Sequence, residues 1–201
     1  MAGVLDQAGI VFMFAPTMHP AMRHVGPIRR ELGIPSVMNL VGPLANPALA
    51  GRQVMGVADA SRVPLVAAAL AELGTIHALV VHGAPGLDEI SPLGMTQVIE
   101  VRNGTVTEWS IDPVAEGFSG STAAQLAGGE PIENARIIEA ILDGRGSAGA
   151  EAAVLLNAAG AIYVAGLASH FGSSLSMARE ALRSGAGRQA LQRLRRAAPR
   201  G

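Results

Sequence analysis

The chain has 201 residues, of which 49% are hydrophobic and 15% charged, and its formal net charge is −1. It contains no cysteine, which excludes disulfide bonds, thiolate metal sites and a cysteine nucleophile. The small net charge excludes a global electrostatic field that would attract nucleic acid or an anionic membrane. The length suits one domain with a substantial hydrophobic core.

The apolar residues are mainly alanine, valine, leucine and isoleucine, because only 3% of the chain is aromatic. Its mean hydropathy is +0.35. This composition is typical of parallel strands that are buried on both faces and covered by Ala-rich helices.

The first half of the chain contains several short apolar runs. Residues 9–15 are continuously apolar and are followed by Pro16, which predicts a buried strand. Residues 36–41 and 54–58 predict two further strands. The N-terminus lacks the basic start and apolar core of a secretory signal, so we expect a cytoplasmic protein.

The middle of the chain alternates between helix and strand patterns. Residues 63–73 predict a helix that ends at Gly74, and residues 75–81 predict the next strand. The dipeptide Asn103-Gly104 separates two alternating segments, Thr96–Arg102 and Thr105–Ile111. Because Asn-Gly is the strongest two-residue turn signal, these segments predict a β-hairpin.

The last third of the chain predicts helices over residues 134–142, 150–165, 173–183 and 188–196. Residues 152–178 contain no charged side chain, but alanines and polar residues interrupt the run, so a buried helix is favoured over a membrane span. The fold class predicted for the single domain 1–201 is therefore α/β. We expect a mixed, mostly parallel open sheet with an edge hairpin and flanking Ala-rich helices.

Ligands of open α/β sheets bind outside the carboxyl ends of the strands. Three segments that follow predicted strands carry unusual chemistry: residues 15–20, 42–47 and 82–89. Their convergence predicts a site at this edge.

Two segments, residues 19–48 and 76–89, are the most informative for function. Arg29 is a candidate anion ligand in the first of them. Proline disrupts a helix interior, so Pro27 is predicted to begin a new helix with Arg29 in its first turn. The free N–H groups and dipole at that end favour an anion, which a guanidinium binds bidentately. A solvated surface arginine fits the pattern equally well.

Asp88 and Glu89 are adjacent acids in a loop rich in glycine and proline. Carboxylates on such a loop suit Mg²⁺, which shares its other positions with water and substrate phosphates. Solvated surface acids fit the pattern equally well. His19 is either a polar pocket residue or a helix cap, whereas His77 and His82 have no metal-ligand spacing and are expected to be structural.

The C-terminal region is rich in arginine, with Arg179, Arg183, Arg188, Arg193, Arg195, Arg196 and Arg200 offset only by Glu180. Such a helix can follow a phosphate backbone. No aromatic residues are interleaved to stack on bases, so a solvated helix face is favoured.

Both informative segments resemble the anthranilate phosphoribosyltransferases of tryptophan biosynthesis. The resemblance covers nearly the whole chain, and its most specific block runs from residue 19 to residue 48. The matching motifs are Phe14-Ala-Pro, His19-Pro-Ala-Met-Arg-His-Val, Ile28-Arg-Arg-Glu-Leu-Gly, Asn39-Leu-Val-Gly-Pro-Leu, Asn46-Pro-Ala, Val80-Val-His-Gly, Gly86-Leu-Asp-Glu-Ile, Gly128-Gly and Leu156-Asn-Ala-Ala-Gly.

The resemblance implies a nucleoside phosphorylase/phosphoribosyltransferase-like catalytic domain and a pentosyltransferase activity. The amine of anthranilate would displace pyrophosphate from phosphoribosyl pyrophosphate (PRPP), without a covalent enzyme intermediate and therefore without a nucleophilic catalytic residue. By similarity, Arg29 holds the anthranilate carboxylate, and Asp88 and Glu89 bind Mg²⁺ bridging to the diphosphate. His19, Gly42 and Pro43 match residues that line the anthranilate tunnel.

The chain departs from the family in lacking a preceding helical domain and a glycine-rich diphosphate loop with its lysine. We therefore expect it to be the C-terminal part of the enzyme and inactive by itself. Family members are homodimers, and the departure puts a homodimer of this chain in doubt.

Two alternatives remain open. Pyrimidine nucleoside phosphorylases resemble this fold, but their phosphate motifs contain lysine, and this chain has none. A non-catalytic relative that binds nucleic acid is the other alternative; the basic C-terminal helix favours it, and the retained Asp88, Glu89 and Arg29 argue against it.

Overall fold

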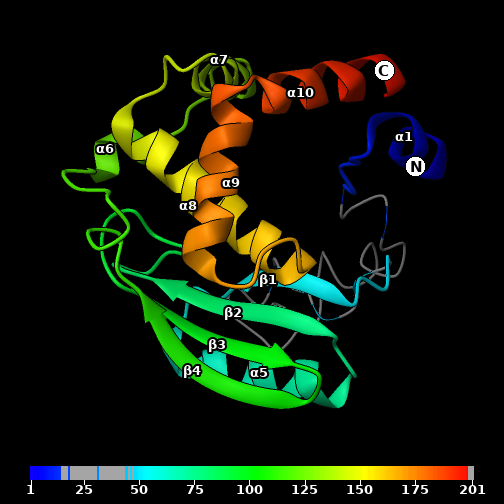
Figure 1. Ribbon diagram of the computed structural model, residues 1–201, viewed down its shortest axis with the longest axis vertical. Helices are drawn as coiled ribbons and strands as arrows, with labels where there is room; N and C mark the ends of the chain where they lie inside the picture. Colours follow the sequence, from blue (N-terminus) through cyan, green and yellow to red (C-terminus); the bar gives the residue numbers. More distant parts are fainter. Residues whose placement is uncertain (15–17, 19–30, 32–43, 45, 47, 199–201) are drawn as a thin grey trace. The chain divides into compact units, whose positions relative to one another are not determined.

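The computed structural model describes residues 1–14, 18, 31, 44, 46 and 48–198. The chain divides into two compact units, one made of Met1–Ala50 with Gly187–Gly201 and the other of Gly51–Ala186. The second unit carries the four-stranded sheet (Figure 1). This unit therefore contains the carboxyl ends of the strands, where ligands of open α/β sheets bind.

The sheet has the strand order β1-β2-β3-β4. Its strands are β1 (Arg52–Gly56), β2 (His77–Gly83), β3 (Thr96–Arg102) and β4 (Thr105–Ile111). The pair β1–β2 is parallel, whereas β2–β3 and β3–β4 are antiparallel. The α/β class and the mixed sheet are thus confirmed, although parallel pairing is the smaller share within the described part of the sheet. The predicted strand at 36–41 lies outside the described residues.

The β3–β4 hairpin has the predicted boundaries. Asn103 and Gly104 both have positive φ, 50° and 80° respectively. A two-residue turn with two positive φ angles matches the right-handed twist of the flanking strands, and asparagine and glycine adopt it with little strain. The hairpin was predictable because its register is set by this local chemistry.

The β1–α5–β2 segment confirms the predicted order with shifted ends. Strand β1 begins two residues before the predicted run, α5 (Val63–Glu72) follows a short 3₁₀ turn, and β2 lies two residues later than predicted. Gly74, with φ of 73°, provides the left-handed residue that ends the helix. The first six residues of β2 are apolar or histidine, and its first five are buried, as expected for a strand covered on both faces.

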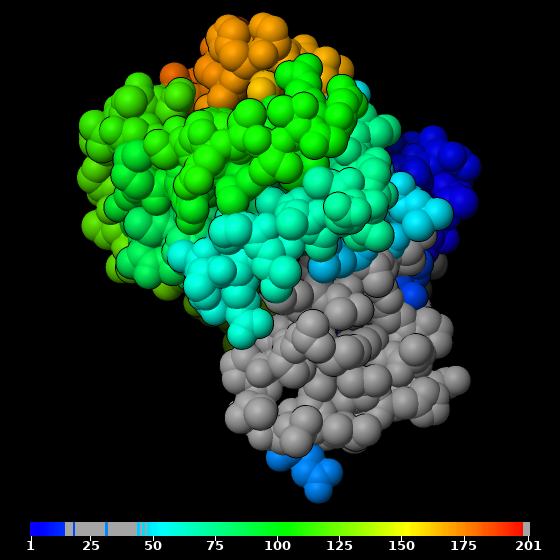
Figure 2. All heavy atoms as spheres, turned by 90° about the horizontal axis from the view of Figure 1, so that it is seen from below, coloured from blue at the N-terminus to red at the C-terminus, as the bar shows by residue number. Residues whose placement is uncertain are grey.

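The second unit forms three layers. Helix α5 covers one face of the sheet, and α8 (Ala148–Ala165) and α9 (Phe171–Arg183) cover the other (Figure 1). Two shorter helices, α6 (Ala123–Leu126) and α7 (Pro131–Leu142), precede α8. Figure 2 shows the face that carries α5, in cyan to teal, beside the green β3–β4 hairpin.

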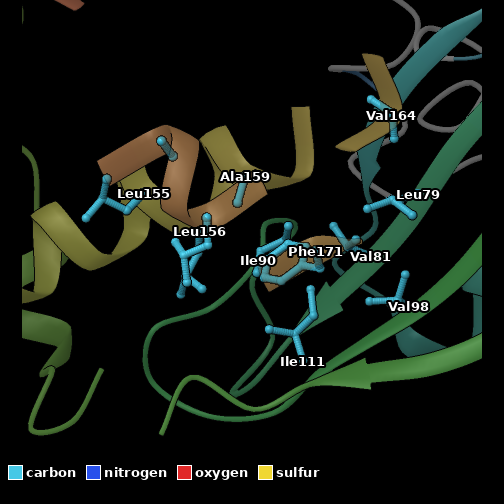
Figure 3. Packing of buried hydrophobic residues seen from close by; sticks show 12 residues of the cluster. Leu79, Val81, Ile90, Val98, Ile111, Leu155, Leu156, Ala159, Val164 and Phe171 are labelled. Atoms are coloured by element: carbon cyan, nitrogen blue, oxygen red, sulfur yellow. The ribbon is translucent and has the colours of Figure 1, made fainter. Parts of the chain in front are cut away.

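The main hydrophobic core lies between the sheet and the α8–α9 layer. Figure 3 shows Leu156 and Ala159 of α8 facing Val81, Ile90 and Phe171. Leu156, Ala159, Val81 and Ile90 have no exposed surface. Ile90 belongs to this core although it lies in the loop between β2 and β3, so the core anchors that loop.

Helix α8 has the length and apolar composition of a membrane span, but half of its apolar window is buried inside the protein. Leu155 and Leu156 belong to the core between the layers. The uncharged run at 152–178 thus falls in two helices, α8 and α9, that pack in the core, in line with the prediction of buried helix.

The first unit corrects one prediction. Helix α1 (Ala2–Ala8) ends at Gly9, which has φ of 72°, and residues 10–14 form no strand. Phe12 is 74% exposed, and its ring stacks on that of Phe14 at 6.4 Å. The buried strand predicted at 9–15 is wrong for its described residues, because an apolar run does not itself supply the pairing that makes a strand.

Helix α10 (Ala186–Ala197) confirms the last predicted helix and extends it slightly at both ends. Within the first unit, Arg193 Nε donates a hydrogen bond of 3.2 Å to the carbonyl oxygen of Ala8. This hydrogen bond connects the N-terminal helix α1 with the C-terminal helix α10.

Candidate functional site

Asp88 and Glu89 lie beyond the carboxyl end of β2, as predicted. A tight turn follows Gly83, whose N–H donates to the carbonyl oxygen of Leu87 (2.8 Å) and whose carbonyl accepts from the Leu87 N–H (2.7 Å). Both acidic side chains are exposed. They make no hydrogen bond or ion pair with any residue that the structure describes. No described residue therefore occupies their oxygens.

The backbone that carries these two acids rests directly on the ends of both parallel strands. A Cβ atom on Gly56, the last residue of β1, would lie 1.5 Å from the Asp88 carbonyl oxygen. A Cβ atom on Gly83, the last residue of β2, would lie 2.4 Å from the Glu89 carbonyl oxygen. Only glycine permits this approach at either position, so the two glycines allow the backbone of the acidic loop to contact the strand ends directly.

Helix α8 holds the loop from its other side. The N–H of Ile90 donates to Asn157 Oδ1 at 3.0 Å, and Asn157 Nδ2 donates to the Ile90 carbonyl oxygen at 2.9 Å. The sequence motif that contains Asn157 was part of the resemblance, but no role was predicted for this side chain. The two partners lie 67 residues apart, so no local pattern could reveal their contact.

The segment after Ile90 is fixed by Ser91 and Thr96, both fully buried. The Ser91 N–H donates to Thr96 Oγ1 at 2.9 Å, and the Ser91 hydroxyl donates to the Ala84 carbonyl oxygen. The acidic pair is therefore bracketed by ordered backbone on both sides while its side chains remain in solvent.

This arrangement suits a cation that takes part of its shell from elsewhere. No group of three or more His, Cys, Asp or Glu side chains that could hold a metal occurs among the described residues. Mg²⁺ commonly uses one or two protein carboxylates and completes its octahedron with water and substrate phosphates. Two free carboxylates on a fixed loop fit that pattern, whereas they do not fit a closed structural site.

The two histidines near the sheet ends have structural roles, as expected. His82 Nδ1 donates to the Val57 carbonyl oxygen at 2.9 Å, which ties β2 to the segment that follows β1. His77 Nε2 lies 2.8 Å from Glu100 Oε1, and both residues are buried.

Glu100 is the centre of a polar cluster that the sequence did not reveal. Besides His77, it accepts hydrogen bonds from Trp109 Nε1 (3.0 Å) and from the Tyr163 hydroxyl (3.0 Å). Burial, and then the hydrogen bond to Glu100, raise the pKa of Tyr163 above its ordinary value. One signal was present: Glu100 occupies a position of β3 that alternates in phase with buried Thr96 and Val98.

A shallow pocket of about 440 Å³ adjoins this cluster, lined by Glu100, Arg102, Asn103, Thr105, Thr107 and Tyr163. It lies by the start of β2, the amino-terminal edge of the parallel pair, because His77 is paired with Arg102. Asp88 and Glu89 lie at the opposite edge. The pocket is therefore not part of the acidic site.

Two arginines of the C-terminal region, both on α9, contact the protein itself. Arg179 donates to the Glu116 carbonyl oxygen and lies 4.9 Å above the Phe118 ring, while Arg183 pairs with Glu180. These contacts argue against a continuous basic face along α9, in line with the solvated helix face that the sequence favoured over a nucleic-acid surface.

The predicted anthranilate-binding residues Arg29, His19, Gly42 and Pro43 lie outside the described residues. Their predicted roles stay predictions.

Comparisons with known proteins identify the relatives of this chain. The model of the glycosyl transferase family, a/b domain, matches residues 1–188. The anthranilate phosphoribosyltransferase of Thermomicrobium roseum is 48% identical over 199 residues, covering 97% of this chain and 57% of that protein. The chain thus spans little more than half the length of such curated relatives.

Solved structures of anthranilate phosphoribosyltransferases also match this chain. The crystal structure of anthranilate phosphoribosyltransferase from Thermus thermophilus matches with a TM-score of 0.86 and 39% identity, covering 96% of this chain and 56% of that one. The Saccharomyces cerevisiae enzyme in complex with PRPP and Mg matches with a TM-score of 0.79 and 29% identity, covering 89% and 52%.

Proposed function

Because the chain belongs to the glycosyl transferase family, a/b domain, we propose that it carries part of an anthranilate phosphoribosyltransferase of tryptophan biosynthesis. The reaction is the transfer of the phosphoribosyl group of PRPP to anthranilate. The amine nitrogen bonds to the anomeric carbon, the bond from that carbon to pyrophosphate breaks, and the amine loses a proton. We further propose that residues 1–201 act as one α/β glycosyltransferase domain of a cytoplasmic enzyme.

The observation that carries the proposal is the exposed acidic pair on a fixed loop at the carboxyl ends of β1 and β2. Asp88 and Glu89 are free of partners among the described side chains, and glycines at both strand ends hold their backbone in place. In an open α/β sheet this edge is where substrates bind. A leaving diphosphate is anionic, so two carboxylates can only serve it through a cation.

Asp88 and Glu89 would hold Mg²⁺, which when bound stabilises the negative charge that develops on the diphosphate. Arg29 would hold the anthranilate carboxylate through a bidentate contact, and His19, Gly42 and Pro43 would line its passage. The protein's own contribution is then chiefly positioning, which places the amine and the anomeric carbon within reach of each other.

The experiment is a chimaera. The segment of the Thermus thermophilus enzyme that this chain matches is replaced by this chain, and phosphoribosyl-anthranilate formation is measured with anthranilate, PRPP and Mg²⁺. We expect activity, and we expect Asp88→Asn combined with Glu89→Gln to reduce kcat/KM by about 100-fold or more, because lost charge stabilisation is worth several kcal/mol. Glu108→Gln, an exposed acid on β4, is the matched control and should leave the rate unchanged.

Two further arms test the substrate assignments. Arg29→Ala should raise the anthranilate KM by roughly 10- to 150-fold with little change for PRPP, because a charge-assisted contact is lost. The chain assayed by itself should turn over far below an ordinary enzyme rate of about 1 s⁻¹, since its sequence has no glycine-rich diphosphate loop. An inactive chimaera, or one indifferent to both acidic substitutions, would contradict the proposed function.

A further inference from the structure

The side chains of Asp88 and Glu89 are exposed and have no described side-chain partner. Their direction is therefore set by the backbone that carries them. The backbone of the next residue, Ile90, is completely buried in the core and bonded to a single side chain, that of Asn157. We propose that Asn157 is a positioning residue for the Asp88–Glu89 pair. This inference rests on the proposed function, because it assigns a role toward the metal that the pair is proposed to hold.

The hydrogen-bond pattern fixes the Asn157 amide in one orientation. Its oxygen accepts from the Ile90 N–H at 3.0 Å, while its nitrogen donates to the carbonyl oxygens of Ile90 and Ala153, both at 2.9 Å. A flipped amide would place its NH₂ group against an N–H and its oxygen against two carbonyls. Both amide protons are thus committed, and the side chain acts as a rigid bracket between α8 and the loop.

The Ile90 side chain is seated on the same face of α8. A Cβ atom on Gly160, three residues after Asn157, would lie 2.8 Å from Ile90 Cδ1. Positions three apart on a helix are neighbours, so the helix receives the Ile90 backbone at Asn157 and its side chain at Gly160. The residue that follows the acidic pair is therefore fixed in position and in rotation.

The loop is then held from three directions: Gly56 of β1 beneath Asp88, Gly83 of β2 beneath Glu89, and Asn157 of α8 at Ile90. Gly56 and Gly83 allow the loop to lie close to the sheet, and Gly83 also exchanges two backbone hydrogen bonds with Leu87, just before the pair. Asn157 adds the side-chain hydrogen bonds that hold the residue just after the pair. Groups hydrogen-bonded directly to metal ligands typically contribute about 10- to 100-fold to metal affinity. Asn157 acts on the backbone of the next residue, so we expect the lower end of that range.

Two substitutions on α8 test this role: Asn157→Asp is the test variant, and Tyr163→Phe is the control. Asn157→Asp has the same shape and keeps an acceptor for the Ile90 N–H, but its oxygens cannot donate to either carbonyl. Tyr163→Phe removes one hydrogen bond, to Glu100, from the last turn of the same helix. Both variants lose polar contacts of α8, and only the first touches the acidic loop.

The test uses the isotope-labelled full chain, with Mn²⁺ alone as a paramagnetic probe. In the wild type, Mn²⁺ should broaden the amide signals of residues 83–91 before others, and Asp88→Asn with Glu89→Gln should abolish this. Asn157→Asp should require about 10-fold more Mn²⁺ for the same broadening, and Asn157→Ala, which also removes the acceptor, should accelerate hydrogen exchange at the Ile90 amide. Tyr163→Phe should do neither.

The outcomes separate the two proposals. Absence of localised broadening in the wild type overturns the proposed metal site, and with it this inference. Localised broadening in the wild type with an unchanged titration in Asn157→Asp overturns the positioning role alone. If Asn157→Asp does not fold, Asn157→Ala replaces it, because alanine removes the same bonds without adding a charge and favours helix; the same shift in titration is expected.

Discussion

Carboxylates have opposite environments at the two ends of the parallel strands β1 and β2. At the amino-terminal edge of the parallel pair, Glu100 is buried and accepts hydrogen bonds from His77, Trp109 and Tyr163. At the carboxyl edge, Asp88 and Glu89 are exposed, and no described side chain pairs with them.

The difference shows that partners, more than residue type, decide what a carboxylate does. A buried carboxylate without donors would be strongly destabilising, so the protein surrounds Glu100 with three. Those donors leave it little capacity for a ligand. The exposed pair contributes little to folding, and its lone pairs stay free for a cation. One edge therefore stabilises the fold, while the other is available for chemistry.

The strongest test of this contrast is Glu100→Ala. The substitution leaves one buried donor, His77, and two half-buried donors, Trp109 and Tyr163, without an acceptor, so the free energy of unfolding should fall by about 2–4 kcal/mol. Urea unfolding measures this. Glu108→Ala is the control, because it removes an exposed acid whose one hydrogen bond among the described residues is to Gln97. A loss below about 1 kcal/mol for Glu100→Ala would mean that water replaces the carboxylate.

The second test concerns the close approach at the carboxyl edge. Gly56→Ala forces a methyl group into the Asp88 carbonyl, so we expect a loss of about 1–3 kcal/mol in unfolding free energy from overpacking. The Ile90 amide should also exchange faster as the loop lifts. In contrast, a Cβ atom on Gly172 meets its nearest neighbour at 3.6 Å, and Gly172→Ala should be neutral or slightly stabilising. Equal effects at both glycines would refute the packing argument.

The third test uses Tyr163, the only tyrosine of the chain. Tyr163→Phe should reduce the unfolding free energy by about 1 kcal/mol at neutral pH, because one hydrogen bond to Glu100 is lost. Burial and Glu100 raise the pKa of Tyr163 above 10.0, so the phenol stabilises the fold only while it is protonated. This contribution is complete below pH 10.0 and disappears as the pH rises through the folded-state pKa.

Urea unfolding of both proteins across this pH range, with tyrosinate absorbance as the titration signal, checks the expectation. The stability difference between the wild type and Tyr163→Phe should shrink above pH 10.0. A difference that stays constant across the titration would show that the phenol ionises equally easily in both states.

The smallest expected effect is that of the acidic pair on stability. Asp88→Asn with Glu89→Gln should change the unfolding free energy by less than about 0.5 kcal/mol, as is usual for exposed positions. Urea unfolding without added metal measures it. A loss as large as that of Glu100→Ala would mean that the pair is a structural feature and would remove the contrast between the two edges.

Much of the candidate site followed from local patterns. The acidic pair was placed at a strand exit because an apolar run ends in a segment rich in glycine and proline. The hairpin was placed to the residue because Asn103-Gly104 determines both the turn and the register. The strand predicted at 9–15 failed because Gly9 adopts a left-handed conformation after a helix and the apolar residues beyond it remain unpaired.

The sequence by itself therefore determined the helices of the second half, the hairpin and the presence of two acids in a loop, because each depends on neighbours within a few residues. Only the tertiary structure decided which side chains hold that loop and which carboxylate is buried. Asn157 meets Ile90 across 67 residues, and Tyr163 meets Glu100 across 63. Such contacts form when α8 packs on the sheet, and packing depends on the shape of the whole core rather than on any periodicity in the chain.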